Sequence, residues 1–257
     1  MNSKYLFRNL IIAFFLLLFT FGCTSTNSRK VTIATAANMQ FVMKEIAAAF
    51  TQETGIDCDV IISSSGKLTA QIKEGAPYDV FISADTKYPK ILYEKGFTSN
   101  IPKIYGYGTL VLWSFSENVP LDINLLTQNQ IEHIALANPK TAPYGTAAIE
   151  VLKHAKIYDQ ISEKLVFGES ISQTNQFILS GAAQIGFTAK SVVLSPQMKG
   201  KGEWISIDST SYTPIAQAAV IIKKDKISDA AMKFYEFLFS TKSKEILENF
   251  GYLVPVK

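Results

Sequence analysis

The sequence contains few of the residues that cross-link small domains or bind metal ions. Its 257 residues include two cysteines, Cys23 and Cys58, and two histidines, His133 and His154. Two cysteines do not make a disulfide framework, and the histidines stand at no metal-ligand spacing from each other or from a cysteine. The sequence therefore predicts neither a disulfide-rich scaffold nor a zinc or iron centre, and we expect no cofactor.

Charge of either sign is also scarce. Lys and Arg number 25 and Asp and Glu 22, a formal net charge of +3, and the basic residues are scattered, with no run beyond Lys223 and Lys224. So small and dispersed a positive charge does not indicate nucleic-acid binding. A hydrophobic content of 47% with 18% charged residues excludes a disordered chain. The length suits one large α/β domain or two lobes.

The longest apolar run, residues 10–21, is too short to span a bilayer comfortably. Lys4 and Arg8 precede this run and Gly22 follows it, which is the pattern of an export signal. Residues 1–22 are therefore predicted to be a signal peptide, and the mature protein is predicted to be exported.

The pair Gly22–Cys23 resembles the cleavage box of bacterial lipoproteins, although Thr20 and Phe21 depart from its usual residues. By this resemblance Cys23 is lipidated, residues 23–30 form a polar tether, and the lipid anchors the protein at the membrane surface. The alternatives are plain cleavage, an uncleaved anchor, or a disulfide between Cys23 and Cys58. The last is disfavoured because Cys58 lies in an apolar run typical of core cysteines.

From residue 31 onward, short β-branched runs alternate with amphipathic helical patterns. The predicted strands are 31–35, 58–62, 79–83, 109–115, 131–136, 164–167, 184–188 and 216–222, with helices between most of them and at 230–250. This alternation predicts an α/β fold whose mainly parallel sheets carry helices on both faces. Turn residues at 105–108 and 214–217 predict two crossings, so that lobe 1 comprises residues 31–106 and 216–257 and lobe 2 residues 107–215.

Four strand-to-helix turns place hydrogen-bond donors at helix starts. They contain Asn38, Ser65, Tyr144 with Gly145, and the run 170–172. Ligands of open α/β sheets bind beyond the carboxyl ends of the strands, and helix N-termini there favour anions. The plainer interpretation is that Ser and Asn at these positions are ordinary N-caps, each contributing about 1 kcal/mol.

Two catalytic interpretations fit poorly. Ser64 and Lys67 have the Ser-x-x-Lys spacing of penicillin-recognising acyl enzymes, but the accompanying Ser-Asp-Asn and Lys-Thr-Gly motifs are absent. The same segment lacks the first glycine of a phosphate-binding P-loop, and Leu68 stands where that motif has Ser or Thr. We therefore expect a binding protein and no enzyme.

Four segments carry a resemblance to a known family. They are Ala-Thr-Ala-Ala-Asn at 34–38, Ser-Ser-Ser-Gly-Lys-Leu at 63–68 with Gln-Ile at 71–72, Gly-Ala-Pro-Tyr-Asp-Val-Phe-Ile-Ser-Ala-Asp at 75–85, and Asn-Pro at 138–139 with Ala-Pro-Tyr-Gly at 142–145. Together they resemble the periplasmic molybdate-binding proteins of ABC importers. The resemblance extends from about residue 31 to residue 255.

This resemblance implies a two-lobed periplasmic binding protein of type II, in which a hinge joins lobes that hold molybdate or tungstate between them. Carried over by position, the side chains of Asn38 and Ser65 donate from lobe 1, and the backbone N–H groups of Tyr144 and Ile171 donate from lobe 2. Some members add a lobe-2 tyrosine donor, but Ala189 stands at that position here. The implied partner is an ABC importer permease, to which a monomer delivers the anion. A binding protein for sulfate or phosphate is the alternative.

Overall fold

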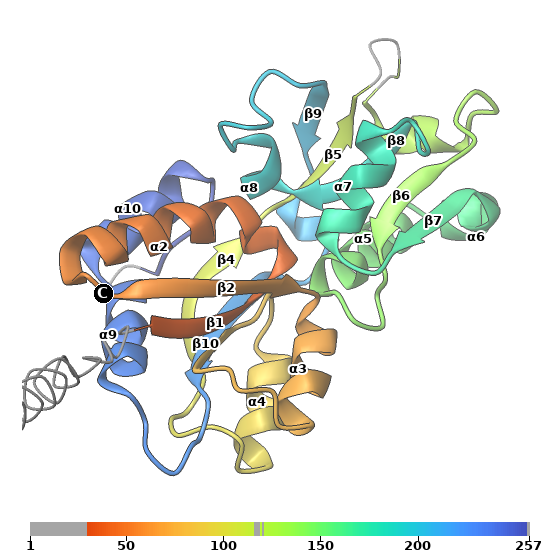
Figure 1. Ribbon diagram of the computed structural model, residues 1–257. Coiled ribbons are helices and arrows are strands. Elements are labelled where there is room, and N and C mark those ends of the chain that lie inside the picture. The colour runs from red at the N-terminus through yellow and green to blue at the C-terminus, as the bar shows by residue number, and fades with distance from the viewer. Residues whose placement is uncertain (1–29, 116–118, 120, 256–257) are drawn as a thin grey trace, which may run out of the picture.

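The computed structural model describes residues 30–115, 119 and 121–255, which form two α/β lobes side by side (Figure 1). The predicted signal peptide, Cys23 and the tether up to residue 29 lie outside the described residues. Among the residues that are described, no helix combines the length and hydropathy needed to cross a membrane.

Lobe 1 is built on a five-stranded sheet of order β2-β1-β3-β10-β4. Its strands are β1 (Lys30–Ala36), β2 (Asp57–Ser63), β3 (Val80–Ile82), β4 (Lys103–Gly108) and β10 (Ile215–Ile221). Its helices are α2 (Gln40–Thr54), α3 (Ser65–Lys73), α4 (Lys87–Glu94), α9 (Asp229–Leu238) and α10 (Thr241–Asn249). Apolar side chains of α2, α9 and α10 pack on one face of the sheet, and those of α3 and α4 pack on the other.

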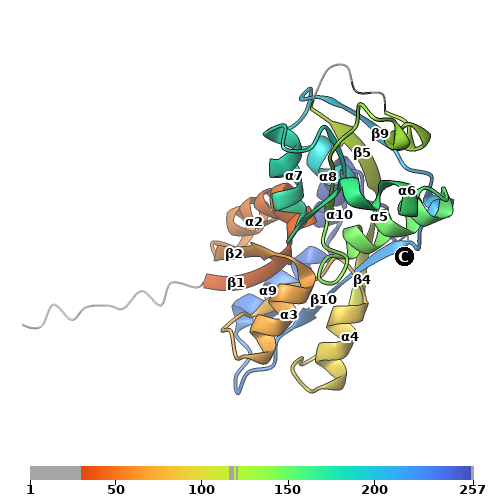
Figure 2. The ribbon, with the colours of Figure 1, turned by 90° about the vertical axis from the view of Figure 1, so that its right-hand side faces the viewer.

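Lobe 2 repeats this plan with a second five-stranded sheet of order β7-β6-β8-β5-β9. Its strands are β5 (Leu110–Ser114), β6 (Ile134–Ala137), β7 (Leu165–Gly168), β8 (Ile185–Ala189) and β9 (Glu203–Ser206). Its helices are α5 (Pro143–His154), α6 (Tyr158–Ile161), α7 (Ile171–Leu179) and α8 (Lys190–Val193). Figure 2 shows this lobe above lobe 1.

Each sheet has one strand that runs against the other four. In lobe 1 this strand is β10, which is antiparallel to β3 and β4, and in lobe 2 it is β5, which is antiparallel to β8 and β9. Both are the first strands that the chain enters after it changes lobe, because β5 follows β4 and β10 follows β9. The chain passes into lobe 2 over Thr109, between the end of β4 and the start of β5.

Local sequence explains where the helices begin and end. The hydroxyl oxygens of Ser64, Ser170 and Ser228 cap α3, α7 and α9 by accepting a backbone N–H of the first turn. Pro143 stands at the first turn of α5, where a missing N–H costs nothing. Gly55 ends α2 with φ of 67°, a left-handed conformation that glycine adopts without strain.

Some elements were not predicted from the sequence. They are α4, β4, β9 and several short helical turns. Residues 105–108, interpreted from the sequence as turn residues at a crossing, lie instead in strand β4, which pairs with β10. The α/β class and the helices on both faces of the sheets agree with the prediction.

The two lobes contact each other closely. The N–H of Gly66 donates to the carbonyl of Thr141 at 2.9 Å, and the hydroxyl of Ser172 donates to Gln40 Oε1 at 2.6 Å. One buried cluster also joins Ala36 and Ala84 of lobe 1 to the core of lobe 2. The structure is therefore the closed form of a two-lobed protein.

Candidate functional site

A small, tightly lined cavity lies between the lobes. All four residues predicted to contact the ligand line it, together with six neighbours. The lining consists of Ala36, Ala37, Asn38, Ser64, Ser65, Ala84, Ala142, Pro143, Tyr144 and Ile171. Residues far apart in the sequence, from both lobes, therefore meet at one place.

Four helical starts surround this cavity. They are the 3-10 turn Ala37–Met39, α3, α5 and α7, whose first residues include Ser65, Tyr144 and Ile171. The first N–H groups of a helix have no partner within the helix, and the helix dipole places partial positive charge at this end. The cavity therefore gathers N–H donors and positive potential without a charged side chain.

Ser65 supplies a side-chain donor to the cavity. It is 1% exposed, and its Oγ accepts a hydrogen bond from the N–H of Ala84 at 3.0 Å. Among the described residues, no acceptor takes the hydroxyl proton of Ser65. The N–H of Ala84 thus fixes the oxygen and leaves the proton available to a ligand.

Asn38 is held differently from the prediction. Its Nδ2 donates to Gln217 Oε1 at 2.9 Å and to the hydroxyl of Tyr252 at 2.8 Å, so both hydrogens of the amide nitrogen are used within the protein. The backbone N–H of Asn38 lies in the first helical turn, where N–H groups have no partner within the helix. In this arrangement Asn38 offers the cavity its backbone N–H and not its side-chain N–H.

Close packing positions the donors of lobe 2. A Cβ on Gly145 would lie 1.9 Å from the carbonyl oxygen of Ala137, so only glycine lets the first turn of α5 rest on the end of β6. This contact places the N–H of Tyr144 beside the cavity. Ile171 begins α7 directly after its capping residue Ser170, whose Oγ accepts the N–H of Gln173 at 3.4 Å.

Ala189 does not supply a donor. It is the last residue of β8, is fully buried, and is not part of the cavity lining. The absence of a tyrosine at this position, noted from the sequence, therefore leaves the donor set without a phenol from β8.

A buried polar network, which was not predicted from the sequence, lies behind the cavity. It links Asn38 with Tyr105, Tyr144, Ser191, Gln217 and Tyr252, all 3% exposed or less. Burial raises the pKa of Tyr252 to about 12 and raises the pKa of Tyr105 and of Tyr144 well above the usual value. These hydroxyls are therefore uncharged at neutral pH. Because bonded residues such as Asn38 and Tyr252 are 214 residues apart, no local sequence pattern indicates this network.

The Ser-x-x-Lys segment has no catalytic arrangement in this structure. Ser64 Oγ accepts the backbone N–H of Lys67 as a helix cap, and Lys67 Nζ pairs with the carboxylate of Glu169 in lobe 2. The amine is thus engaged by Glu169 and is not directed at the hydroxyl that it would have to activate.

Comparisons with known proteins identify relatives over most of the chain. The molybdate-binding protein ModA of Rhodobacter capsulatus is 38% identical over 227 residues, which cover 87% of this chain and 88% of the relative. ModA of Azotobacter vinelandii is 36% identical over 230 residues, 89% of this chain and 91% of the relative. The solved structure of the Azotobacter vinelandii periplasmic molybdate-binding protein superposes with a TM-score of 0.83 at 34% identity, covering 88% of this chain and 100% of that chain.

The resemblance and the two-lobed fold predicted from the sequence are both confirmed by these comparisons. The family model described as bacterial extracellular solute-binding protein matches residues 31–253, nearly all the residues that the structure describes. This chain belongs to the family of bacterial extracellular solute-binding proteins.

Proposed function

We propose that this protein captures molybdate or tungstate between its lobes and delivers the anion to an ABC importer. The observation that supports this proposal is the cavity, where uncharged donors from four helical starts converge from both lobes. Relatives of more than 35% identity that are named molybdate-binding proteins support the choice of anion.

The donor chemistry suits a doubly charged oxyanion. A hydrogen bond to a charged acceptor contributes about 1.5–3 kcal/mol net, so about six of them reach sub-micromolar affinity after the costs of closure and desolvation. No Lys or Arg is required at the cavity, and none of its lining residues is charged. The anion is held by the Ser65 hydroxyl and by backbone N–H groups, including those of Tyr144 and Ile171.

A closed cavity with fixed donors also selects among anions. Sulfate is smaller than molybdate and would leave some donors without a partner, which costs binding energy. Phosphate at neutral pH carries a proton, and this proton would face donors that have nothing to accept it. The same cavity therefore favours molybdate and tungstate over both.

The first experiment is calorimetric titration of the chain lacking residues 1–23. We expect sub-micromolar binding of molybdate and tungstate and at least 100-fold weaker binding of sulfate and phosphate, about 3 kcal/mol in free energy. Perchlorate, a tetrahedral anion of single charge, is the control for non-specific anion binding. Heat with sulfate or phosphate and none with molybdate would assign the protein to the alternative anions.

Closure couples ligand capture to delivery. Donors from both lobes reach one anion only when the lobes are closed, so the ligand shifts the open-to-closed equilibrium toward the closed form. The importer permease would then receive the protein in this form.

The proposal includes a lipid anchor on Cys23, which lies outside the described residues. Gly22 precedes this cysteine and a polar tether follows it, an order that suits a domain held at a membrane surface. Native mass spectrometry of the detergent-extracted protein is expected to give a monomer that begins at Cys23 and carries the mass of acyl chains. A mature N-terminus at any other residue, or an unmodified Cys23, would exclude the anchor.

A further inference from the structure

We propose that Gln217 is a positioning residue that joins the cavity residues of the two lobes and favours the closed form. Gln217 lies in β10 and is completely buried. Its Oε1 accepts from Asn38 Nδ2 at 2.9 Å and from the hydroxyl of Tyr105 at 2.6 Å. Its Nε2 donates across the lobe boundary to the hydroxyl of Tyr144 at 3.1 Å. One amide therefore contacts two residues that line the cavity, one from each lobe.

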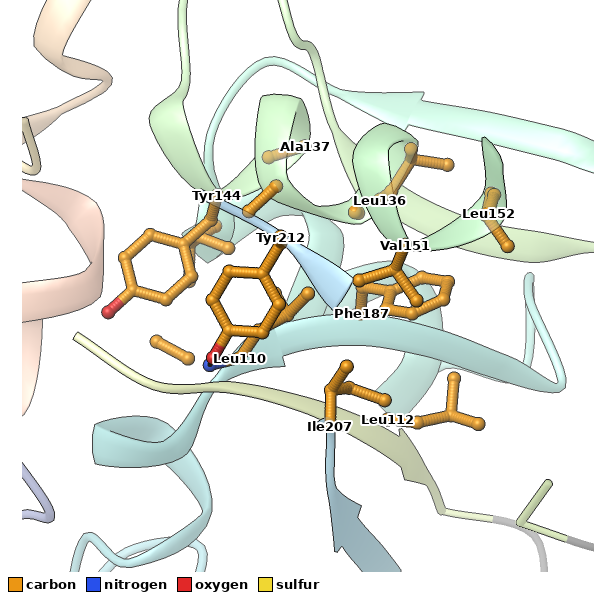
Figure 3. Close-up of a cluster of buried hydrophobic side chains, with 14 of the residues drawn as sticks. Leu110, Leu112, Leu136, Ala137, Tyr144, Val151, Leu152, Phe187, Ile207 and Tyr212 are labelled. Atoms are coloured by element: carbon orange, nitrogen blue, oxygen red, sulfur yellow. Dashed lines mark hydrogen bonds between the residues drawn. The ribbon is translucent and has the colours of Figure 1, made fainter. Parts of the chain in front are cut away.

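Tyr144 has two separate roles in this arrangement. Its backbone N–H belongs to the first turn of α5 at the cavity, whereas its hydroxyl is bonded by a lobe-1 residue. Figure 3 shows its hydroxyl directed away from Leu136 and Val151 in the lobe-2 core. The neighbouring Tyr212 instead keeps its hydroxyl within lobe 2, where it accepts the N–H of Leu110 at 3.2 Å.

Gly108 provides independent support for this bond. A Cβ on Gly108 would lie 2.0 Å from the Tyr144 hydroxyl and 2.3 Å from Gln217 Nε2. Gly108 does not have the positive φ that would by itself favour glycine. The missing side chain at the end of β4 is therefore explained by the space that the Tyr144–Gln217 pair occupies.

Opening of the lobes breaks the buried hydrogen bond between Gln217 and Tyr144. When α5 moves away from β10, Gln217 Nε2 loses the Tyr144 hydroxyl, and a buried donor without a partner is unfavourable unless water replaces it. The amide itself is kept in place by Tyr105, and through Asn38 it holds the first helical turn at the cavity. Gln217 thus biases the empty protein toward the arrangement that the ligand needs.

The test compares Gln217→Leu, Tyr144→Phe and the double variant with the wild-type chain lacking residues 1–23. It rests on the proposed function for its ligand, so the Kd for molybdate is measured beside the radius of gyration of the empty protein. Tyr144→Phe is expected to bind molybdate about tenfold more weakly, and Gln217→Leu at least as weakly, because it also releases Asn38 and Tyr105. The double variant is expected to bind no more weakly than Gln217→Leu, because the bond that Tyr144→Phe removes is already lost in Gln217→Leu. The empty variants are expected to have a larger radius of gyration.

Tyr212→Phe is the matched control, since it removes a buried tyrosine hydroxyl that bonds within one lobe. It is expected to lower the Tm and to leave both the Kd and the radius of gyration unchanged. Should Gln217→Leu fail to fold, Tyr144→Phe decides alone, because it keeps the backbone N–H and the ring.

A Kd within twofold of wild type for Tyr144→Phe would overturn the inference. If wild-type protein gives no heat with molybdate, the proposed function fails, and scattering of the empty proteins then decides the role of Gln217. A larger radius of gyration for Tyr144→Phe would support that role, and an equal radius would refute it.

Discussion

Ser65→Ala is expected to raise the Kd for molybdate about 10- to 150-fold, because a hydrogen bond to a charged acceptor contributes about 1.5–3 kcal/mol net. The structure gives the reason for choosing this residue. Ser65 Oγ already accepts the N–H of Ala84, so its proton is left for a ligand in the cavity. Calorimetry on the chain lacking residues 1–23 measures the change.

The same substitution is expected to lower the Tm of the empty protein. Ala84 loses its acceptor, and a buried N–H without a partner costs about 1–3 kcal/mol. Ser228→Ala provides the comparison, because it removes the cap of α9, costs about 1 kcal/mol, and lies outside the cavity lining. Ser228→Ala should reduce the Tm and keep the Kd. If Ser65→Ala behaves in the same way, Ser65 is structural and not a ligand donor.

Gly66→Ala is expected to weaken molybdate binding about 100-fold or more, which corresponds to the loss of at least two charge-assisted hydrogen bonds. A Cβ at this position would lie 2.8 Å from the Tyr88 hydroxyl and 2.9 Å from Thr141 Cα. The tyrosine side chain can move, but Thr141 Cα is backbone of lobe 2, so the lobe itself must retreat. Donors from the two lobes then no longer reach one anion.

The empty Gly66→Ala protein should be at least as stable as wild type. Gly66 is the second residue of α3, a helical position that alanine adopts at least as readily as glycine. Lys67→Ala is the control one residue away, because it removes an exposed ion pair with Glu169, an interaction of about 0–1 kcal/mol. Small-angle scattering with saturating molybdate completes the test. A fully closed Gly66→Ala protein with wild-type affinity would show that the lobes tolerate the added methyl group.

The strongly patterned elements were predictable from the sequence because their signals are local. Strand β1 contains a run of β-branched residues, and α5 begins with Pro143 and continues with an apolar face. Strand β4 was missed because two glycines in six residues resemble a turn, and its ladder partner β10 lies more than one hundred residues later. Helix α4 was missed because it carries Pro89 in its first turn, where proline is tolerated.

Some features of the candidate site were likewise predictable from the sequence, and others were not. Ser65, Tyr144 and Ile171 stand at helix starts, a position that the sequence indicates directly, and the structure places them around one cavity. The orientation of the Asn38 amide was not predictable, because Gln217 and Tyr252, which hold it, are 179 and 214 residues away. No sequence pattern around Gln217 indicates that this strand residue connects the two lobes.

The strand order of lobe 1 has a consequence for the order in which the chain can assemble. Strand β4 lies at the edge of its sheet beside β10, and β10 also pairs with β3. Every residue of lobe 2 is synthesised between β4 and β10. Lobe 2 is therefore complete, as one continuous stretch of chain, while the sheet of lobe 1 still lacks β10. The segment synthesised last then completes the lobe that was begun first.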